Sequence, residues 1–162
     1  MKNKKLFMDV DGCVRKFSEA IGLNNPKEWV KLYQDTWNMI DNDPKKFLFD
    51  CNAFEDVKQW VKDRLHEVVF LTNQNGVKSR EEWTKKFLEK HFGEKIDVRF
   101  VSTFGEKIEY LIENTHMILI DDYPKFYQRK GFDKIKDRLY LMERSWNENV
   151  RHKYVKFYED LK

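Results

Sequence analysis

Two short apolar runs constrain the fold of this chain more than any other feature of its sequence. Residues 68–71 read VVFL and residues 117–120 read MILI, so apolar side chains stand at both odd and even positions. Because side chains alternate across a strand, such runs are suited to strands that are buried on both faces of a sheet. Parallel sheets flanked by helices have this property, so the runs indicate an α/β protein.

The rest of the pattern favours a Rossmann-like parallel sheet flanked by helices. Strands are predicted at residues 5–10, 66–73, 97–103, 116–122 and 138–143. Helices are predicted to start at Asn25-Pro26 and at Ser79, each with a capping-box glutamate, and to cover residues 53–64, 106–113 and 150–161. Strands that alternate with helices form parallel βαβ units.

The segment between the first strand and the helix at 53 is unusually long, at about forty residues. A crossover between parallel strands does not need that length. We therefore interpret residues 15–50 as a small helical cap inserted after the first strand, above the carboxyl ends of the strands. Residues 1–14 and 51–162 then form the α/β core. Trp37 is expected to pack inside this cap.

Composition limits the classes of partner. The net charge is only +3, from 31 basic and 28 acidic residues, so nucleic acid is not expected as the main partner. No apolar stretch approaches the roughly 18 residues that span a bilayer, and the apolar run after the basic first residues is too short for a signal peptide. With two cysteines, both expected to be reduced, a cytoplasmic location is predicted. The oligomeric state stays open.

Two aspartates follow the first predicted strand. In an extended chain Asp9 and Asp11 project to the same side, because side chains alternate along a strand. Carboxylates this close repel each other unless something compensates, and a cation is one compensator. The fourth predicted strand also ends in a pair of acids, Asp121 and Asp122. Carboxyl ends of parallel strands meet at one edge of the sheet, where ligands bind in open α/β proteins.

These carboxylates suit phosphate chemistry. Asp9 can act as a nucleophile, while Asp11 can protonate a leaving oxygen and later activate a water molecule. A dianionic phosphate needs charge neutralisation before a carboxylate can attack it. Mg²⁺ binds one or two carboxylates together with substrate phosphate oxygens, and Asp121 or Asp122 would complete its ligands.

Further polar residues could hold the phosphoryl oxygens. Thr72 and Asn73 end the second predicted strand, and Lys107 follows the third. A hydroxyl, a backbone N–H and an ammonium group are suitable donors to a phosphoryl group. Lys78 and Lys95 are alternative sources of the positive charge.

In order and spacing, these residues resemble the haloacid dehalogenase-like (HAD) hydrolases. The four motifs of that superfamily correspond to D-x-D-G at residues 9–12, Thr72 after an apolar strand, Lys107, and the acidic pair at 121–122. The resemblance covers the whole proposed core. It implies an aspartyl-phosphate intermediate on Asp9 and Mg²⁺ bound by the Asp9 carboxylate, the Asp11 carbonyl and the acidic pair.

Within that superfamily, the chain looks most like the 5′(3′)-deoxyribonucleotidases. These enzymes carry a small helical cap and an aromatic residue eight positions after the nucleophile that packs on the nucleobase; Phe17 stands at that position. The pair Trp146-Asn147 is a further similarity. Lys16 departs from the family's usual acidic residue, and Asn73-Gln74 replaces its Ser-Pro. The sequence TNQ-x-G instead is similar to sugar-phosphate and polynucleotide 3′-phosphatases of the same superfamily.

The sequence therefore predicts a Mg²⁺-dependent phosphomonoesterase whose substrate is a small phosphate monoester, with a nucleotide as the leading candidate. A sugar phosphate or a polynucleotide end is the alternative within the same chemistry. A catalytically silent phosphate-binding protein is the alternative of another class. The presence of both Asp9 and Asp11 argues against a catalytically silent protein, because phosphate binding alone does not need an acid/base residue.

Overall fold

The computed structural model describes residues 5–28 and 34–162 and contains a five-stranded, all-parallel sheet. The strands are β1 (Leu6–Met8), β2 (Val68–Asn73), β3 (Val98–Val101), β4 (Ile118–Asp121) and β5 (Leu139–Leu141), in the order β3-β2-β1-β4-β5. All five predicted strands and the predicted α/β class are thereby confirmed. Among the described residues no helix is both long and apolar enough to cross a bilayer.

Helices cover both faces of this sheet, as the doubly apolar runs require. Leu6 and Met8 of β1 pack in one buried cluster, together with α3 (Glu55–Asp63) and α4 (Lys78–Phe92). Phe7, which points the other way, packs in a second cluster with α5 (Phe104–Glu113) and α6 (Phe132–Ile135). The two cores lie on opposite sides of one strand because side chains alternate along it.

The order of the strands determines where a ligand can bind. The chain runs outward from β1 to β2 and β3, then returns to β4, on the other side of β1. β1 and β4 pair directly, with Met8 opposite Ile120. In sheets of this kind ligands bind where the strand order reverses, outside the carboxyl ends of the strands. Asp9 and Asp121 stand at this position.

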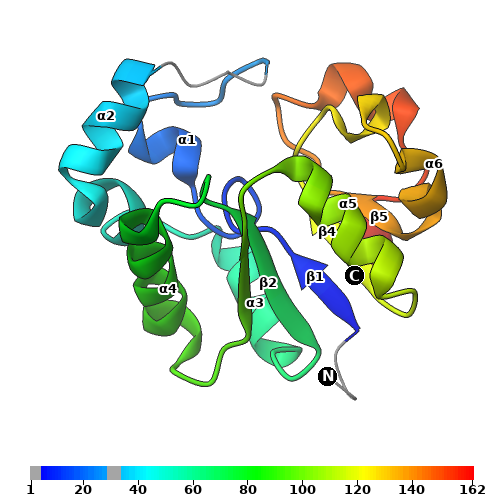
Figure 1. Ribbon diagram of the computed structural model, residues 1–162, viewed down its shortest axis with the longest axis horizontal. Helices are drawn as coiled ribbons and strands as arrows, with labels where there is room; N and C mark the ends of the chain where they lie inside the picture. Colours follow the sequence, from blue (N-terminus) through cyan, green and yellow to red (C-terminus); the bar gives the residue numbers. More distant parts are fainter. Residues whose placement is uncertain (1–4, 29–33) are drawn as a thin grey trace.

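Residues 15–50 contribute α1 (Phe17–Ala20), α2 (Gln34–Asn42) and the π-helical turn η1 (Lys45–Phe49). Figure 1 shows α1 and α2 beyond the end of the sheet toward which β1 points. Within the described part of this segment, Ile40, Phe47 and Leu48 form a separate small buried cluster. Trp37 packs against this cluster, as expected, and so does Trp83 of α4, which connects the segment to the core.

The predicted helix over residues 150–161 is wrong. The chain forms two short 3₁₀ turns instead, η4 (Glu148–Lys153) and η5 (Tyr158–Leu161), and Phe157 between them forms a parallel bridge with Leu141 of β5. Tyr154 is buried in the core on one face of the sheet, and Tyr158 in the core on the other. A continuous helix would place residues four apart on one side, so it cannot satisfy both cores.

One predicted helix start is also wrong, and the helix predicted at Ser79 is present as α4 with its N-cap displaced to Val77. Asn25 has a positive φ of 48°, and residues 26–28 form no helix. The part of that prediction over residues 29–33 lies outside the described residues, and α2 is described from Gln34. Ser79 lies inside α4, which follows Val77 and has no side-chain cap. The remaining short 3₁₀ turns, η2 (Phe126–Gln128) and η3 (Lys136–Arg138), flank α6.

Candidate active site

A buried lysine joins the ends of β1 and β4. The Lys107 side chain, which projects from α5, donates from Nζ to Asp9 Oδ1 and to Asp121 Oδ2, at 2.7 Å in each case. All three residues are buried, at 5% exposure or less. Lys78 and Lys95 are exposed and do not line the cavity described below, so Lys107 is the lysine that the fold brings to the predicted site.

Burial and crowding of charges perturb these groups. Burial, together with the nearby Asp121 and Asp11 carboxylates, raises the pKa of Asp9 to about 7, although Lys107 opposes the rise. Burial by itself would lower the pKa of Lys107, but the two carboxylates beside it hold this pKa above its ordinary value. The ammonium group therefore remains charged and neutralises only part of the acidic cluster.

The two acids at the end of β4 have different surroundings. Asp121 is fully engaged by the protein, because its Oδ1 accepts from the backbone N–H of Tyr123 at 2.9 Å and its Oδ2 accepts from Lys107. Asp122 Oδ2 accepts from the Trp146 indole N–H at 2.8 Å. Burial, with the carboxylates of Asp121 and Asp9, raises the pKa of Asp122 well above its ordinary value.

Gly12 allows Asp122 to approach the loop that follows β1. Gly12 has a φ of +79°, and a Cβ atom at this position would lie 2.0 Å from Asp122 Oδ2. A side chain is therefore excluded at this position by both conformation and space. The close approach of backbone and carboxylate explains why a glycine follows the second aspartate.

Three buried side chains could hold a metal ion in the described part of the chain. Potential ligand atoms of Asp9, Asp122 and Cys13 all lie within 4.8 Å of one another. The Cys13 sulfur is a soft donor, which suits a hard cation such as Mg²⁺ poorly. The remaining donors, Asp9 and Asp122, are carboxylates, which suit a hard cation such as Mg²⁺. This excess of buried negative charge is what a divalent cation would relieve.

The carboxylate of Asp11 does not belong to this group of ligands. Its Oδ1 accepts from Arg15 Nε at 2.6 Å, and its Oδ2 accepts from Gln74 Nε2 at 3.0 Å. Asp11 is partly exposed, with 24% of its side chain accessible, and it lines the cavity. The predicted acid/base is thus at the site, held by one donor on each oxygen.

The end of β2 contributes to the same site. Thr72 is buried, and its Oγ1 lies 3.3 Å from Gln74 Nε2. The Asn73 side chain accepts from the backbone N–H of Asn75, which has a φ of +54°. Asn73 therefore shapes the turn after the strand, while Thr72 and Asn73 both line the cavity.

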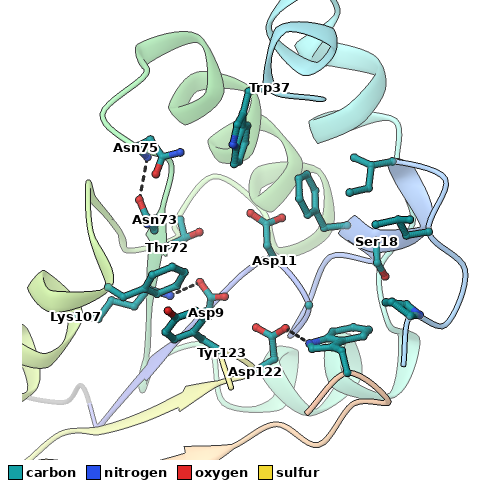
Figure 2. A pocket seen from close by; sticks show the side chains of 17 residues that line it. Asp9, Asp11, Ser18, Trp37, Thr72, Asn73, Asn75, Lys107, Asp122 and Tyr123 are labelled. Carbon is teal, nitrogen blue, oxygen red and sulfur yellow. Dashed lines mark hydrogen bonds and ion pairs between the residues drawn. The ribbon is translucent and has the colours of Figure 1, made fainter. Parts of the chain in front are cut away.

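A cavity of about 300 Å³ opens over these groups. Figure 2 shows Asp9, Asp11 and Asp122 pointing into one space, with Trp37 on its far side. Polar residues line its floor: Asp9, Asp11, Thr72, Lys107 and Asp122. Apolar and aromatic residues line its walls: Phe17, Ile21, Leu23, Pro26, Trp37, Phe104, Tyr123 and Trp146. The fold thus brings Phe17 to the cavity over the predicted site.

Sequence reasoning missed several of these residues. Phe104 and Tyr123 stack with ring centroids 3.7 Å apart and form one wall of the cavity. Trp37, which is predicted in the cap, packs beside the cluster of residues 15–50 and also lines the cavity. Arg15 and Gln74 attracted no prediction of a role. A signal for Gln74 is its position two residues after Thr72, where alternation turns both side chains to one side.

Comparison of this chain with family models, with curated proteins and with solved structures finds no match. What the site does is therefore inferred from its own residues.

Proposed function

We propose that this protein is a Mg²⁺-dependent phosphomonoesterase of the HAD type that hydrolyses nucleoside monophosphates. The observation that carries the proposal is the buried Asp9 carboxylate, which lies between Lys107 and Asp122 on the floor of a cavity with aromatic walls. A nucleophile, a cation and an excess of carboxylates beneath an open space are the elements that phosphoryl transfer needs.

The donor set supports a magnesium ion on this floor. Asp9 and Asp122 would hold it, while Asp121 is occupied by Lys107 and Tyr123 and would position the lysine instead. When bound, Mg²⁺ neutralises charge on the phosphoryl oxygens and on the carboxylates around them.

The chain's own residues then divide the reaction. A carboxylate oxygen of Asp9 attacks phosphorus, the bond from phosphorus to the leaving oxygen breaks, and Asp11, which enters this step protonated, gives that oxygen its proton and becomes a carboxylate. Asp11 next takes a proton from a water molecule that attacks the phosphorylated Asp9, which releases inorganic phosphate and restores the carboxylate. Thr72 and Lys107 supply donors to the phosphoryl oxygens during both steps.

Residues 15–50 are inferred to act as the cap that selects the substrate. Phe17 and Trp37 come from this segment and line the cavity wall. A flat apolar nucleobase suits such a wall better than a polar sugar does. One observation favours a sugar phosphate or a polynucleotide end instead, namely the TNQ sequence, whose Gln74 contacts both Asp11 and Thr72.

A screen of phosphate release tests the proposal. The purified protein is assayed with nucleoside monophosphates, sugar phosphates and 3′-phosphorylated oligonucleotides, first with Mg²⁺, then with EDTA, then with Ca²⁺. We expect release from nucleotides that EDTA abolishes and Mg²⁺ restores. Ca²⁺ should restore it poorly, because its larger and looser coordination misplaces phosphorus relative to Asp9. Full activity in EDTA would contradict the metal site, and release from none of the substrates would contradict the enzyme.

A further inference from the structure

Arg15 is the largest charged side chain that the fold buries completely, with no exposed surface among the described residues. A buried guanidinium is costly unless its N–H groups are paired. Its three nitrogens each donate: Nε to Asp11 Oδ1 at 2.6 Å, Nη1 to the Leu48 carbonyl at 2.7 Å and Nη2 to Thr84 Oγ1 at 3.1 Å. The side chain also lies over the Phe87 ring, at 5.2 Å from its centroid.

These partners come from three separate parts of the molecule. Asp11 belongs to the loop after β1, Leu48 to η1 in the segment of residues 15–50, and Thr84 to α4 in the core. The backbone of Arg15 also closes the loop, because its N–H donates to the Val10 carbonyl and its carbonyl accepts from Gly12. Leu48 and Thr84 therefore fix the guanidinium, and among the described residues Asp11 is the one carboxylate that accepts a hydrogen bond from it.

Arg15 does not line the cavity, whereas Asp11 does. The guanidinium hydrogen-bonds one cavity-lining side chain, Asp11, and its carbon also lies 6.0 Å from the ring centroid of Phe17 in the wall. Gln74 holds the second oxygen of the same carboxylate, so the orientation of its plane is set by two donors on rigid supports. A carboxylate in a loop would otherwise rotate among several orientations, and only some of these would aim an oxygen at a leaving group.

We propose that Arg15 is a positioning residue. It orients the Asp11 carboxyl group so that its protonated form can give a proton to the leaving oxygen, and it links that orientation to residues 15–50 through Leu48. The inference rests on the proposed phosphatase function and goes beyond it. A fork of nitrogens at fixed angles is required, because a lysine in this position could not hold Asp11, Leu48 and Thr84 with the same geometry.

The choice of leaving group separates positioning from simple structural support. An alkyl alcohol leaves poorly without a proton, whereas 4-nitrophenolate leaves readily without one. We therefore compare kcat/KM for two alkyl esters, a nucleoside monophosphate and a base-free alkyl phosphate, with kcat/KM for 4-nitrophenyl phosphate, because kcat/KM reports the step in which the alcohol leaves. Asp11→Asn should depress kcat/KM for the alkyl esters much more than for the aryl ester. In the Arg15 variants, a loss confined to the nucleotide would point to the Phe17 ring beside Arg15 and would overturn the positioning role.

Arg15→Gln should show the same pattern with a smaller effect. We expect kcat/KM to fall about ten- to hundredfold for both alkyl esters and to change little for the aryl ester. Arg15→Lys should recover only part of the loss. In the double variant Asp11→Asn/Arg15→Gln, the second change should add no further loss to the nucleotide reaction, because the group it positions is already gone.

Arg138→Gln is the control. Arg138 is half-buried and its Nη1 donates to the carbonyls of Leu111, Asn114 and Met117 at 2.7, 3.2 and 3.1 Å, but neither Arg138 nor these partners line the cavity. This variant should lose stability without changing the ratio of kcat/KM for the alkyl esters to kcat/KM for the aryl ester. If Arg15→Gln does not fold, as judged by circular dichroism, Thr84→Val removes a single anchor and should shift the ratio in the same direction by a few fold.

Equal losses on the alkyl and aryl esters in the Arg15 variants, or additive losses in the double variant, would overturn the positioning role while leaving the phosphatase intact. A rise in the nucleotide reaction would also overturn it, because it would mean that Arg15 restrains Asp11. A wild-type protein inactive on all three esters would reject the proposed function, and the inference with it.

Discussion

The floor and the walls of the cavity are built by different forces. The floor consists of buried charges from the ends of β1 and β4 and from α5, and Lys107 bridges Asp9 and Asp121 within it. The walls consist of apolar and aromatic side chains, several of them from residues 15–50, whose small cluster packs against α4. A floor held by charge tolerates few changes, because a lost partner leaves an uncompensated buried ion.

The difference implies that chemistry and selectivity can be altered separately. Apolar packing is non-directional, so a wall can change its shape while the floor keeps its charges. Substitutions on the floor should therefore affect every substrate, and substitutions on the walls should affect only some of them. The predictions that follow test the floor and the walls, beginning with the largest expected effect.

Asp9→Asn should lower kcat at least about a thousandfold on every phosphate ester, because it removes the proposed nucleophile while keeping size and hydrogen bonding. Steady-state phosphate release measures the effect, and circular dichroism checks the fold. The exposed Asp133 provides a control, since Asp133→Asn should leave the rate unchanged. Residual activity within about tenfold of wild type would rule out the covalent mechanism.

Lys107→Met should destabilise the fold by about 3–5 kcal/mol, because it leaves Asp9 and Asp121 buried without their cation. Urea unfolding measures the free energy of unfolding. Adding Asp121→Asn should recover part of the loss, because one of the two orphaned charges is removed. A single variant as stable as wild type would show that charge pairing does not hold the floor together.

Phe17→Ala should raise KM for a nucleotide by about ten- to a hundredfold, which corresponds to the roughly 1–3 kcal/mol of aromatic stacking on a base. Hydrolysis of a small aryl phosphate should hardly change. Phe49→Ala is the matched control, because Phe49 belongs to the same segment but does not line the cavity. Equal losses of activity on both substrates would assign Phe17 a structural role. No loss of activity on either substrate would show that Phe17 does not contribute to selectivity.

Binding of Mg²⁺ should weaken about tenfold between pH 8 and pH 6. The pKa of Asp9 is raised to about 7 and that of Asp122 is also raised, so at pH 6 the cation must displace a proton that is absent at pH 8. Calorimetric titration at both pH values measures the affinity, and the rise in Tm on adding Mg²⁺ should be larger at pH 8.

The same raised pKa values predict how the stability of the metal-free protein changes with pH. Its folded state holds protons that the unfolded chain has already released, so its stability should fall as pH rises from about 4 to 7. Calorimetry of the metal-binding variants sharpens this test. Asp122→Asn should weaken Mg²⁺ binding, whereas Asp121→Asn should weaken it less, because Asp121 is already bound by Lys107 and Tyr123. Equal Mg²⁺ affinity at pH 6 and pH 8 would contradict the carboxylate site.

The sequence by itself determined the sheet and most of the floor. Apolar runs at 68–71 and 117–120 could be stable only as strands covered on both faces, and such strands are parallel. Once the strands are parallel, their carboxyl ends share one edge, which brings Asp9, Thr72 and Asp121 together without knowledge of any contact. Periodicity within single segments was sufficient for these inferences.

Only the tertiary structure decided which partners meet across long separations. Lys107 lies 98 positions from Asp9, and nothing in local pattern distinguishes it from Lys78 or Lys95. The different surroundings of Asp121 and Asp122 depend on Tyr123 and Trp146, and the burial of Arg15 depends on a carbonyl in η1 and a hydroxyl in α4. The segment over residues 150–161 has a helical period, yet it divides because Tyr154 and Tyr158 are buried in opposite cores. Such choices follow from the packing of whole elements against one another, which no local period encodes.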